Sequence, residues 1–378
     1  MKLLQISNYY PPHVGGVEQV AYDISSALAG EGIDRQVFCF QHEGGDAEGE
    51  VDGVRVVRAG CFAKVASQSL SFSYGRLLKK TFEAFAPDTV IFHYPNPFGA
   101  HYLLKLLKKR PQVRLILWWH LDITKQKLLG KLFEGQTRRL LSRAQTVVAT
   151  SPDYVEGSKW LRSVREKCTV IPCCASDAHI GEDGETRASA AAIRARYAGK
   201  IVCFAVGRHV PYKGMEYLVR ASRLLDDRFR IFIAGEGPLT PQLKELAAGD
   251  GKVSFLGKVS DADLKAYLSA CDLFCFPSVT KNEAFGIALA EAMTFGKPSV
   301  TFRIEGSGVN YVSLGGVTGL EAENANAESF ASCMRVLADD VSLRTRLGCA
   351  AKERAGALFT FRRFAEQTVR LIKEDINA

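Results

Sequence analysis

Short runs of hydrophobic residues alternate with longer amphipathic stretches along the chain, and this alternation predicts an α/β fold. In the first half, Val17–Ala29 carries apolar side chains at helical spacing, which predicts a helix with one buried face. The short apolar runs around it are typical of buried strands. They lie at Leu3–Ser7, Arg35–Phe40, Val54–Val57, Thr89–His93, Leu115–Trp119 and Thr146–Thr150. Strands that alternate with helices indicate a parallel sheet covered on both faces.

The second half repeats this pattern, and the repetition predicts two domains. Its strands are predicted at Ile201–Val206, Arg230–Ala234, Val253–Leu256, Leu273–Phe276 and Ser299–Phe302. A chain of 378 residues is long enough for two such domains. Between them, residues 175–192 form a polar, glycine-containing stretch that is typical of a linker. We therefore expect one domain over residues 1–175 and a second over residues 192–358.

Two doubly wound sheets imply where a ligand would bind. Open parallel sheets bind ligands outside the carboxyl ends of their strands. Two Rossmann-like domains that face each other across a cleft would enclose an elongated ligand between these two edges.

Composition places the chain among ordinary globular proteins, since 47% of its residues are hydrophobic and 24% are charged. No run approaches the roughly 20 apolar residues that span a bilayer. The segment Met1–Ile6 lacks the features of a signal peptide, so we expect a cytoplasmic location. The ten cysteines form no paired CxxC motifs, which favours reduced packing residues.

The net charge of +8 is concentrated in residues 101–143, which hold eleven basic residues and two acidic ones. Within this stretch, Ile123–Arg143 is predicted to form one helix. It is either a surface helix with one buried face or a basic amphipathic surface that rests on anionic lipid at the inner face of the plasma membrane. No nucleic-acid-binding module is recognisable, so we expect no nucleic-acid partner.

The strongest chemical signal is a pair of glutamates, Glu283 and Glu291, with seven residues between them. Glu283 follows a predicted strand, and Glu291 falls in the next predicted helix, about 12 Å further along. That is about the span from the hexose to the ribose of a sugar nucleotide, whose diphosphate would then lie near the helix N-terminus. The alternative is that Glu283 caps the helix and Glu291 is a solvated surface residue.

Three further segments lie at predicted carboxyl edges. Residues 207–214 contain Arg208 and Lys213, which could hold a diphosphate or could belong to a solvated turn. The paired glycines Gly15 and Gly16 would let backbone amides approach a phosphate or sugar closely. His120 could bond a sugar hydroxyl, with Asp122 orienting it, or could be a histidine satisfied in the core.

Together these segments resemble the retaining glycosyltransferases of family 4, which have the GT-B fold. The resemblance covers nearly the whole chain and rests on the order and spacing of several loose motifs. They are Tyr-Pro-Pro…Gly-Gly-Val-Glu at 10–18, Gly-Arg…Lys-Gly at 207–214, Ala-Gly-Glu-Gly-Pro at 234–238, Phe-Leu-Gly at 255–257, Phe-Pro-Ser at 276–278, Glu-Ala-Phe-Gly…Glu-Ala at 283–292 and Gly-Val-Thr-Gly-Leu at 316–320.

The resemblance implies a role for each candidate residue. Glu283 would bind the hydroxyls of the donor sugar and Glu291 the ribose, while Arg208 and Lys213 would bind the diphosphate. The remaining positions implied to contact the donor are His120, Gly15, Gly16, Phe285, Gly286 and Ile287. It further implies a nucleotide-diphosphate sugar as donor, no bound metal, and a last helix over residues 359–378 that returns to the first domain.

The resemblance also leads to expectations about the substrates. A mannose-like sugar on GDP is the first choice of donor, with UDP sugars next. Glu305–Val309 is similar to a subset of the family in polysaccharide and O-antigen synthesis, and many such enzymes use lipid-linked acceptors. Two other functions stay open, a nucleotide-sugar epimerase of the same fold and a non-catalytic sugar-nucleotide-binding protein. A dinucleotide oxidoreductase lacks support because no GxGxxG motif follows either first strand.

Two segments depart from the expected pattern. Family members carry an Asn-Gly-Ile/Val-Asp-like sequence where this chain has Cys173–Asp177. Asp261-Ala262-Asp263 reproduces the metal-binding DxD signature of other glycosyltransferases, but it precedes a predicted helix, so we expect it to cap that helix.

Overall fold

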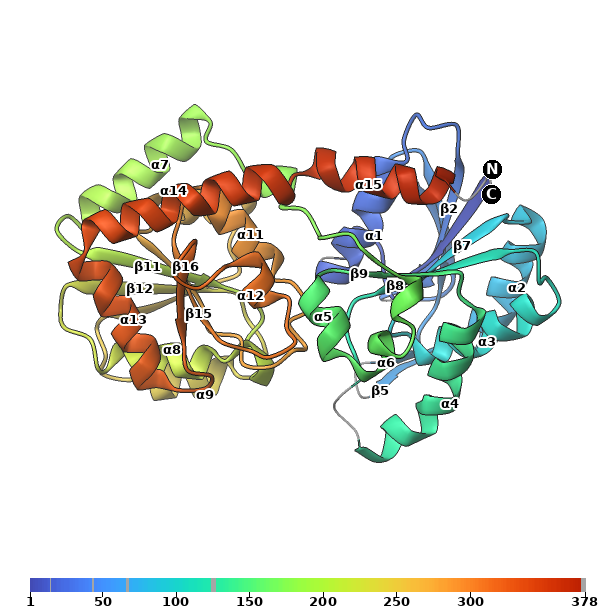
Figure 1. Ribbon diagram of the computed structural model, residues 1–378, viewed down its shortest axis with the longest axis horizontal. Coiled ribbons are helices and arrows are strands. Elements are labelled where there is room, and N and C mark those ends of the chain that lie inside the picture. Colours follow the sequence, from blue (N-terminus) through green and yellow to red (C-terminus); the bar gives the residue numbers. More distant parts are fainter. Residues whose placement is uncertain (14, 43, 66–67, 124–126, 375–378) are drawn as a thin grey trace. The chain divides into compact units, whose positions relative to one another are not determined.

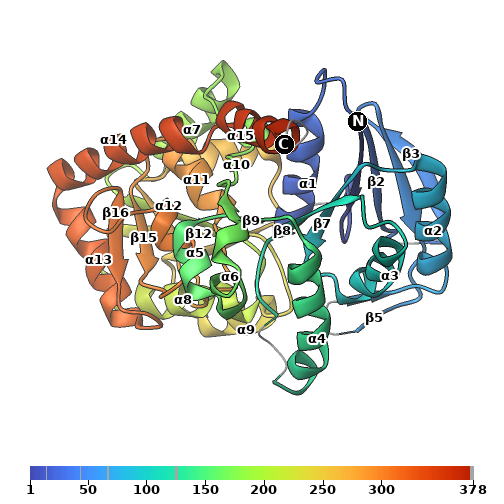
Figure 2. The same cartoon turned by 45° about the vertical axis from the view of Figure 1, so that its right-hand side comes forward.

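The computed structural model of the protein describes residues 1–13, 15–42, 44–65, 68–123 and 127–374. The chain forms two compact α/β units, which Figure 1 and Figure 2 show from two directions. The first unit comprises Met1–Ile171 and the C-terminal stretch from Phe364 onward, and the second comprises Pro172–Arg363. The division after Ile171 comes earlier than the expected linker. Residues 172–191 therefore belong to the second unit.

The second part of the expected linker is helical. Gly184–Arg196 forms helix α7, because Asp183 caps its N-terminus by accepting a hydrogen bond from the backbone nitrogen of Thr186. The glycine and acidic residues that resembled a loop are the start of a helix.

The first unit is built on a sheet of eight strands in the order β10-β9-β8-β7-β1-β2-β4-β3. All pairs are parallel except β3 with β4. The strands are β1 Lys2–Ile6, β2 Asp34–Phe40, β3 Ala47–Val51, β4 Val54–Ala59, β7 Thr89–Tyr94, β8 Arg114–Trp119, β9 Thr146–Ala149 and β10 Cys168–Val170. A separate hairpin pairs β5 Ala63–Val65 with β6 Gln68–Leu70.

Helices cover this sheet because their apolar sides face its buried strands. They are α1 Gly16–Ala27, α2 Tyr74–Phe85, α3 Pro97–Lys108, α4 Lys127–Arg143, α5 Pro152–Gly157, α6 Lys159–Arg162 and α15 Phe361–Glu374. The expected helix from Ile123 begins at Lys127 in the structure, and residues 124–126 lie outside the described part of the chain.

Helix α15 packs on the first unit although it follows the second unit in the sequence. The Arg114 guanidinium donates hydrogen bonds to the carbonyl oxygens of Leu371 and Ile372, at 3.0 and 3.2 Å. The Phe364 ring lies 6.0 Å from that of the buried Trp118, centroid to centroid. Residues 375–378, which the expected last helix included, are outside the described residues.

The second unit is built on a fully parallel sheet in the order β13-β12-β11-β14-β15-β16. Its strands are β11 Ile201–Val206, β12 Phe229–Ala234, β13 Val253–Gly257, β14 Leu273–Phe276, β15 Ser299–Phe302 and β16 Gly319–Ala322. Its other helices are α8 Met215–Ser222, α9 Thr240–Leu246, α10 Asp261–Ala270, α11 Ile287–Thr294, α12 Val309–Val312, α13 Ala327–Asp339 and α14 Val341–Leu358. Buried phenylalanines of the strands, such as Phe204 and Phe274, form the core between the two layers of helices.

Two findings bear on the composition. All ten cysteines are free thiols, and six of them are buried. Within the described ranges, no helix combines the length and the hydropathy that a membrane span requires.

Candidate functional site

The strand order of the second unit changes direction between β11 and β14, and the loops after these strands meet there. The backbone nitrogen of Val279 donates to the carbonyl oxygen of Tyr212 at 3.0 Å. Gly214 has a φ of +60°, and a Cβ atom there would lie 2.1 Å from the carbonyl oxygen of Pro277. The close approach of the two loops therefore requires glycine at this position. Such a switch point is where open parallel sheets bind ligands.

The two loops bring Lys213 and Glu283 into a nearly buried ion pair. Glu283 also accepts a hydrogen bond from Ser278 Oγ at 3.1 Å. Burial is the largest single influence and opposes the charged form of Lys213. The charge of Glu283, its hydrogen bond and the Tyr212 hydroxyl together outweigh burial and raise the pKa of the ammonium group. The site thus holds a permanent cation and a carboxylate side by side.

Arg208 adds a second cation to this edge of the sheet. Its side chain is exposed and makes no hydrogen bond or ion pair with a described residue, and its charge acts on Lys213. Two cations and one carboxylate leave net positive charge, which suits an anionic ligand. The prediction that Arg208 and Lys213 lie at one edge agrees with this arrangement. The solvated-turn alternative does not fit Lys213.

A second glycine loop supports the backbone of Arg208. A Cβ atom at Gly235 would lie 2.1 Å from the carbonyl oxygen of Gly207, and one at Gly237 would lie 2.5 Å from that of His209. The His209 nitrogen donates to the carbonyl oxygen of Glu236 at 3.0 Å. The loops after β11 and β12 are therefore held against each other through backbone contacts.

The loop that carries Glu283 is held in place by residues 307 and 308 of the loop after β15. Ser307 Oγ donates to the carbonyl oxygen of Glu283 at 2.5 Å. A Cβ atom at Gly308 would lie 1.8 Å from the carbonyl oxygen of Ala284, so the two loops are in close contact there. Phe285 is buried and lies edge-on to Phe359, with ring centroids 5.4 Å apart. This support fixes the loop where helix α11 begins.

The N-terminus of α11 opens at this loop. Gly286, with a φ of +94°, precedes the first helical residue, Ile287, and no side chain caps the helix. The amide groups of the first turn are thus available to an anion. Glu283 does not cap the helix, and Glu291 is only 3% exposed, so the alternative of a capping and a solvated glutamate is wrong on both counts.

Glu291 is hydrogen-bonded to a residue that the motifs did not indicate. His179 Nδ1 lies 2.7 Å from Glu291 Oε1, and His179 Nε2 lies 3.2 Å from Asp261 Oδ1. His179 ends a short 3₁₀ helix, Asp177–His179, just after the stretch that departs from the family pattern. Only that departure could have drawn attention to it.

The Asp261-Ala262-Asp263 segment lies in the first turn of α10. Ser260, not an aspartate, is the N-cap, and its Oγ accepts from the Asp263 nitrogen at 3.1 Å. The Asp263 carboxylate accepts from Ser260 Oγ at 2.7 Å, which completes the cap from inside the helix. Nowhere in the described ranges do three or more His, Cys, Asp or Glu side chains form a cluster that could hold a metal ion.

In the first unit, His120 belongs to a buried hydrogen-bond chain. Gln5 Nε2 donates to the Ala21 carbonyl oxygen and to Ser25 Oγ, so its Oε1 is the acceptor left for His93 Nε2, 3.0 Å away. His93 Nδ1 then accepts from His120 Nε2 at 2.9 Å. This chain of donors leaves a lone pair on His120 Nδ1, which can accept a hydrogen bond from a hydroxyl group.

Burial keeps both rings neutral. It lowers the pKa of His120 to about 3, and burial together with the His120 ring lowers the pKa of His93 well below its usual value. Asp122 lies beside this chain, and its Oδ1 accepts from Trp119 Nε1 at 3.0 Å and from Ser158 Oγ at 2.8 Å. The ring partner of His120 is therefore His93, which the sequence analysis placed in a strand but did not name as a site residue.

Gly15 and Gly16 lie where predicted, at the start of α1 after the central strand β1. Gly15 is the N-cap, and a Cβ atom there would lie 2.3 Å from Glu18 Oε2. A cluster of rings that the sequence analysis missed lies nearby. The Tyr9 and His13 centroids are 4.4 Å apart, and those of His13 and His42 are 4.5 Å apart. Polar rings of this kind can stack on and bond to sugars.

Some basic side chains of residues 101–143 are exposed to solvent, and others contact the rest of the first unit. Lys105, Lys108 and Arg139 are exposed. Arg143 donates to the carbonyl oxygens of Pro111 and Val113, and Arg138 lies 5.4 Å from the Trp160 ring. Part of the positive charge thus stabilises the fold.

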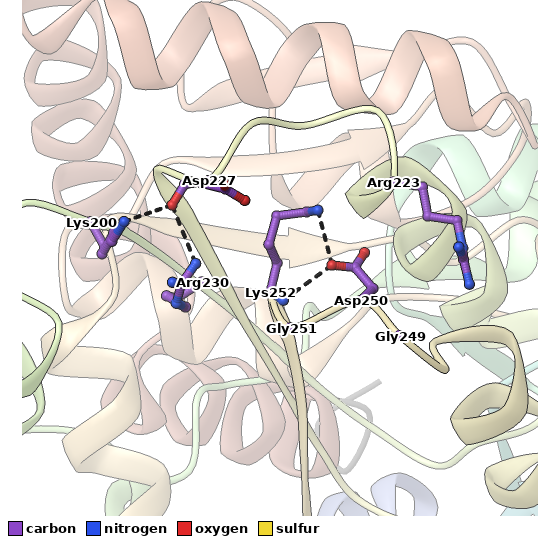
Figure 3. A pocket seen from close by; sticks show the side chains of 8 residues that line it. All are labelled: Lys200, Arg223, Asp227, Arg230, Gly249, Asp250, Gly251 and Lys252. Atoms are coloured by element: carbon purple, nitrogen blue, oxygen red, sulfur yellow. Dashed lines mark hydrogen bonds and ion pairs between the residues drawn. The ribbon is translucent and has the colours of Figure 1, made fainter.

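The second unit also has a cavity of about 510 Å³, shown in Figure 3. It lies at the amino ends of β11, β12 and β13, the edge opposite to Lys213 and Glu283. Its lining residues are Lys200, Arg223, Asp227, Arg230, Gly249, Asp250, Gly251 and Lys252. Because ligands of parallel sheets bind at the carboxyl edge, this cavity is not the candidate site.

Comparisons with known proteins agree with these features. The model described as Glycosyltransferase Family 4 matches residues 14–178, and the one described as Glycosyl transferases group 1 matches residues 200–340. The D-rhamnosyltransferase WbpZ of Pseudomonas aeruginosa is 31% identical over 359 residues, which cover 93% of this chain and 90% of that protein. The chain belongs to glycosyltransferase family 4.

This family 4 glycosyltransferase is also 29% identical to O-antigen chain mannosyltransferase C of Escherichia coli over 363 residues, which cover 95% of each chain. Among solved structures, Anabaena HepE in complex with UDP and glucose aligns with a TM-score of 0.77 at 19% identity, covering 99% of this chain and 100% of that one. The two-sheet architecture is the GT-B fold. The family, fold and enzyme class predicted from the motifs are confirmed.

Proposed function

We propose that this family 4 glycosyltransferase transfers a hexosyl group from a nucleotide-diphosphate sugar to a glycan acceptor during synthesis of a cell-surface polysaccharide. The observation that carries the proposal is the Lys213–Glu283 pair beside Arg208 at the switch point of the second unit. Cations suit the diphosphate, and a carboxylate accepts hydrogen bonds from sugar hydroxyls.

The donor binds to the second unit in this proposal. Arg208 and Lys213 hold the diphosphate and stabilise the charge that develops on it as the glycosidic bond breaks. Glu283 bonds the sugar, and the amides at Phe285, Gly286 and Ile287 contact the sugar and the phosphate. Glu291 bonds the ribose. No metal is required, because the two cations supply the positive charge. Retention of the anomeric configuration follows from family membership.

The first unit presents groups that bind uncharged sugar hydroxyls in this proposal. His120 presents Nδ1 as an acceptor for a sugar hydroxyl. Gly15 and Gly16 lie at the N-terminus of α1, where backbone amides are available to a ligand. The similarity to an O-antigen mannosyltransferase and a D-rhamnosyltransferase favours GDP-mannose or a related GDP-sugar as donor, with UDP-sugars second. It also favours a lipid-linked acceptor at the inner face of the plasma membrane, reached through the exposed cations of residues 101–143.

Thermal unfolding with GDP, UDP, ADP and dTDP and their sugars tests the donor assignment. A ligand that binds only the native state raises the unfolding temperature. We expect one nucleotide family to do so in the wild type, and the shift to be lost in Arg208→Ala. Lys258→Ala, which removes an exposed cation after β13, is the matched control and keeps the shift. Absence of a shift with every nucleotide contradicts the proposal.

Consumption of the donor then separates the transferase from an epimerase. A transferase consumes it only when an acceptor is added, whereas an epimerase converts it without one. Nucleotide binding without either reaction, across a panel of lipid-linked acceptors, would favour the non-catalytic alternative.

A further inference from the structure

The His179–Glu291 contact is unusual because it uses a carboxylate that the proposed function needs for the donor. Glu291 lies on α11 and is nearly buried, and its Oε1 is 2.7 Å from His179 Nδ1. Its Oε2 makes no hydrogen bond with a described residue. One carboxylate oxygen is therefore held by the protein, and the other is left for a ligand.

The far side of the His179 ring is also occupied. His179 Nε2 lies 3.2 Å from Asp261 Oδ1 of α10, and the Asp261 side chain is 69% exposed. The charged groups that face the ring are thus Glu291 from α11 and Asp261 from α10. Each carboxylate accepts a hydrogen bond, so both ring nitrogens must donate, and an imidazole that donates from both nitrogens is the charged imidazolium.

We propose that His179 is a positioning residue that acts as an imidazolium clamp on Glu291 and holds Glu291 Oε2 toward the ribose hydroxyls of the donor. This inference rests on the proposed function, since it assigns Glu291 to the nucleoside part of the donor. A carboxylate held on one oxygen loses little rotational freedom when the ligand binds, so the clamp strengthens donor binding. His179 contacts no reacting atom, and the rate at saturating donor does not depend on it.

The clamp has a definite pH dependence. The hydrogen bond with Glu291 is the largest influence on His179 and raises the pKa of the imidazole despite its partial burial. The clamp is therefore complete in acid, below the ordinary histidine pKa of about 6.5. It weakens as the pH rises through the raised pKa, because the single N–H of a neutral ring is shared between Glu291 and Asp261 and its bond to Glu291 is no longer assisted by the charge of the ring.

Three variants test the clamp. His179→Ala removes it. His179→Asn is the conservative replacement, since the side-chain amide reaches the same region as Nδ1 and donates without a charge. Lys265→Ala is the control, because it removes a cation of the same helix α10 whose partner is Asp183 at 3.0 Å. The readouts are the Kd of the nucleotide that binds the wild type, by titration calorimetry at pH 6.5 and 9, and the KM and kcat for its sugar.

We expect His179→Ala to weaken nucleotide binding and raise the donor KM about tenfold at pH 6.5, since hydrogen bonds to charged groups are the stronger ones. The kcat stays within about twofold, because an interaction that stabilises the bound donor and the transition state equally affects KM and not kcat. His179→Asn restores part of the affinity, because its amide donates without a charge, and it removes the pH dependence. Wild-type Kd rises between pH 6.5 and 9, and Lys265→Ala behaves as the wild type.

An unchanged Kd and KM in His179→Ala, or a pH dependence that persists in both His179 variants, would overturn the clamp while leaving the proposed function intact. A wild type that binds no nucleotide diphosphate overturns both. Loss of kcat with an unchanged KM would assign His179 to the chemical step and would also overturn a positioning role.

Discussion

The two units present opposite electrostatic designs at the carboxyl edges of similar sheets. The second unit holds the charged pair Lys213–Glu283 beside the exposed Arg208. The first holds the neutral chain Gln5–His93–His120, in which burial suppresses protonation. A charged edge binds and stabilises an anion, whereas a neutral edge with a defined lone pair orients uncharged hydroxyls. In a sugar transfer, the departing group is an anion and the sugars are neutral, so the difference matches separate tasks, one unit binding the diphosphate and the other orienting sugar hydroxyls.

The largest expected effect comes from Glu283→Gln, which tests the charged edge of the second unit. The amide keeps the size of the side chain but removes the charge paired with Lys213, so we expect transfer to fall by a factor of at least about 10², as when an oriented electrostatic partner is lost. Steady-state kinetics measures the effect, and circular dichroism confirms the fold. Glu305→Gln, in an exposed position after β15, is the control. Wild-type turnover in Glu283→Gln would refute the donor assignment.

The neutral chain of the first unit is tested by His93→Leu. Without His93, the His120 ring can adopt either tautomer, so Nδ1 is no longer reserved as an acceptor. We expect kcat/KM to fall about tenfold, the range lost with one oriented hydrogen bond. Nitrogen chemical shifts of His120 should show a mixed tautomer. A single unchanged tautomer, or full activity with a mixed one, would remove the role of the chain.

The smallest effect concerns stability in acid. The pKa values of His93 and His120 are lowered in the folded protein, so the unfolded chain binds more protons below about pH 6.5. The stabilisation is therefore complete above that pH and is lost progressively as the pH falls toward 3. Urea unfolding at pH 7, 5.5 and 4 measures this slope, and His120→Gln should flatten it. An equal slope in that variant would assign acid sensitivity to other groups.

The sequence predicted those parts of the fold that have a local signal. Buried strands such as β7 and β11 are short, mostly hydrophobic runs, so their bounds were predicted to within a residue or two. The edge strand β3, Ala47–Val51, was missed because it is mostly exposed and its polar residues give no such run. Helix α7 was missed because glycine and acidic residues at a helix start resemble those of a loop.

The site was predictable only where the residues belong to motifs. Lys213 and Glu283 were both predicted as site residues, but their pairing across 70 residues follows from the order of the strands. The contacts of His179 with Glu291 and of His93 with His120 depend on tertiary structure, and no periodic pattern or motif in the sequence indicates them. Sequence patterns thus indicated the groups that we propose to contact a ligand, and the structure was needed to find the groups that hold them.

The return of α15 to the first unit has a consequence for how the protein is made. Residues 364–374 complete that unit, yet they are synthesised only after all of the second. During translation the N-terminal unit is begun first and finished last, so Trp118 and Arg114 await their partners while the second unit is already folding. The face around Trp118 that α15 covers therefore stays uncovered until the last part of this unit has been synthesised.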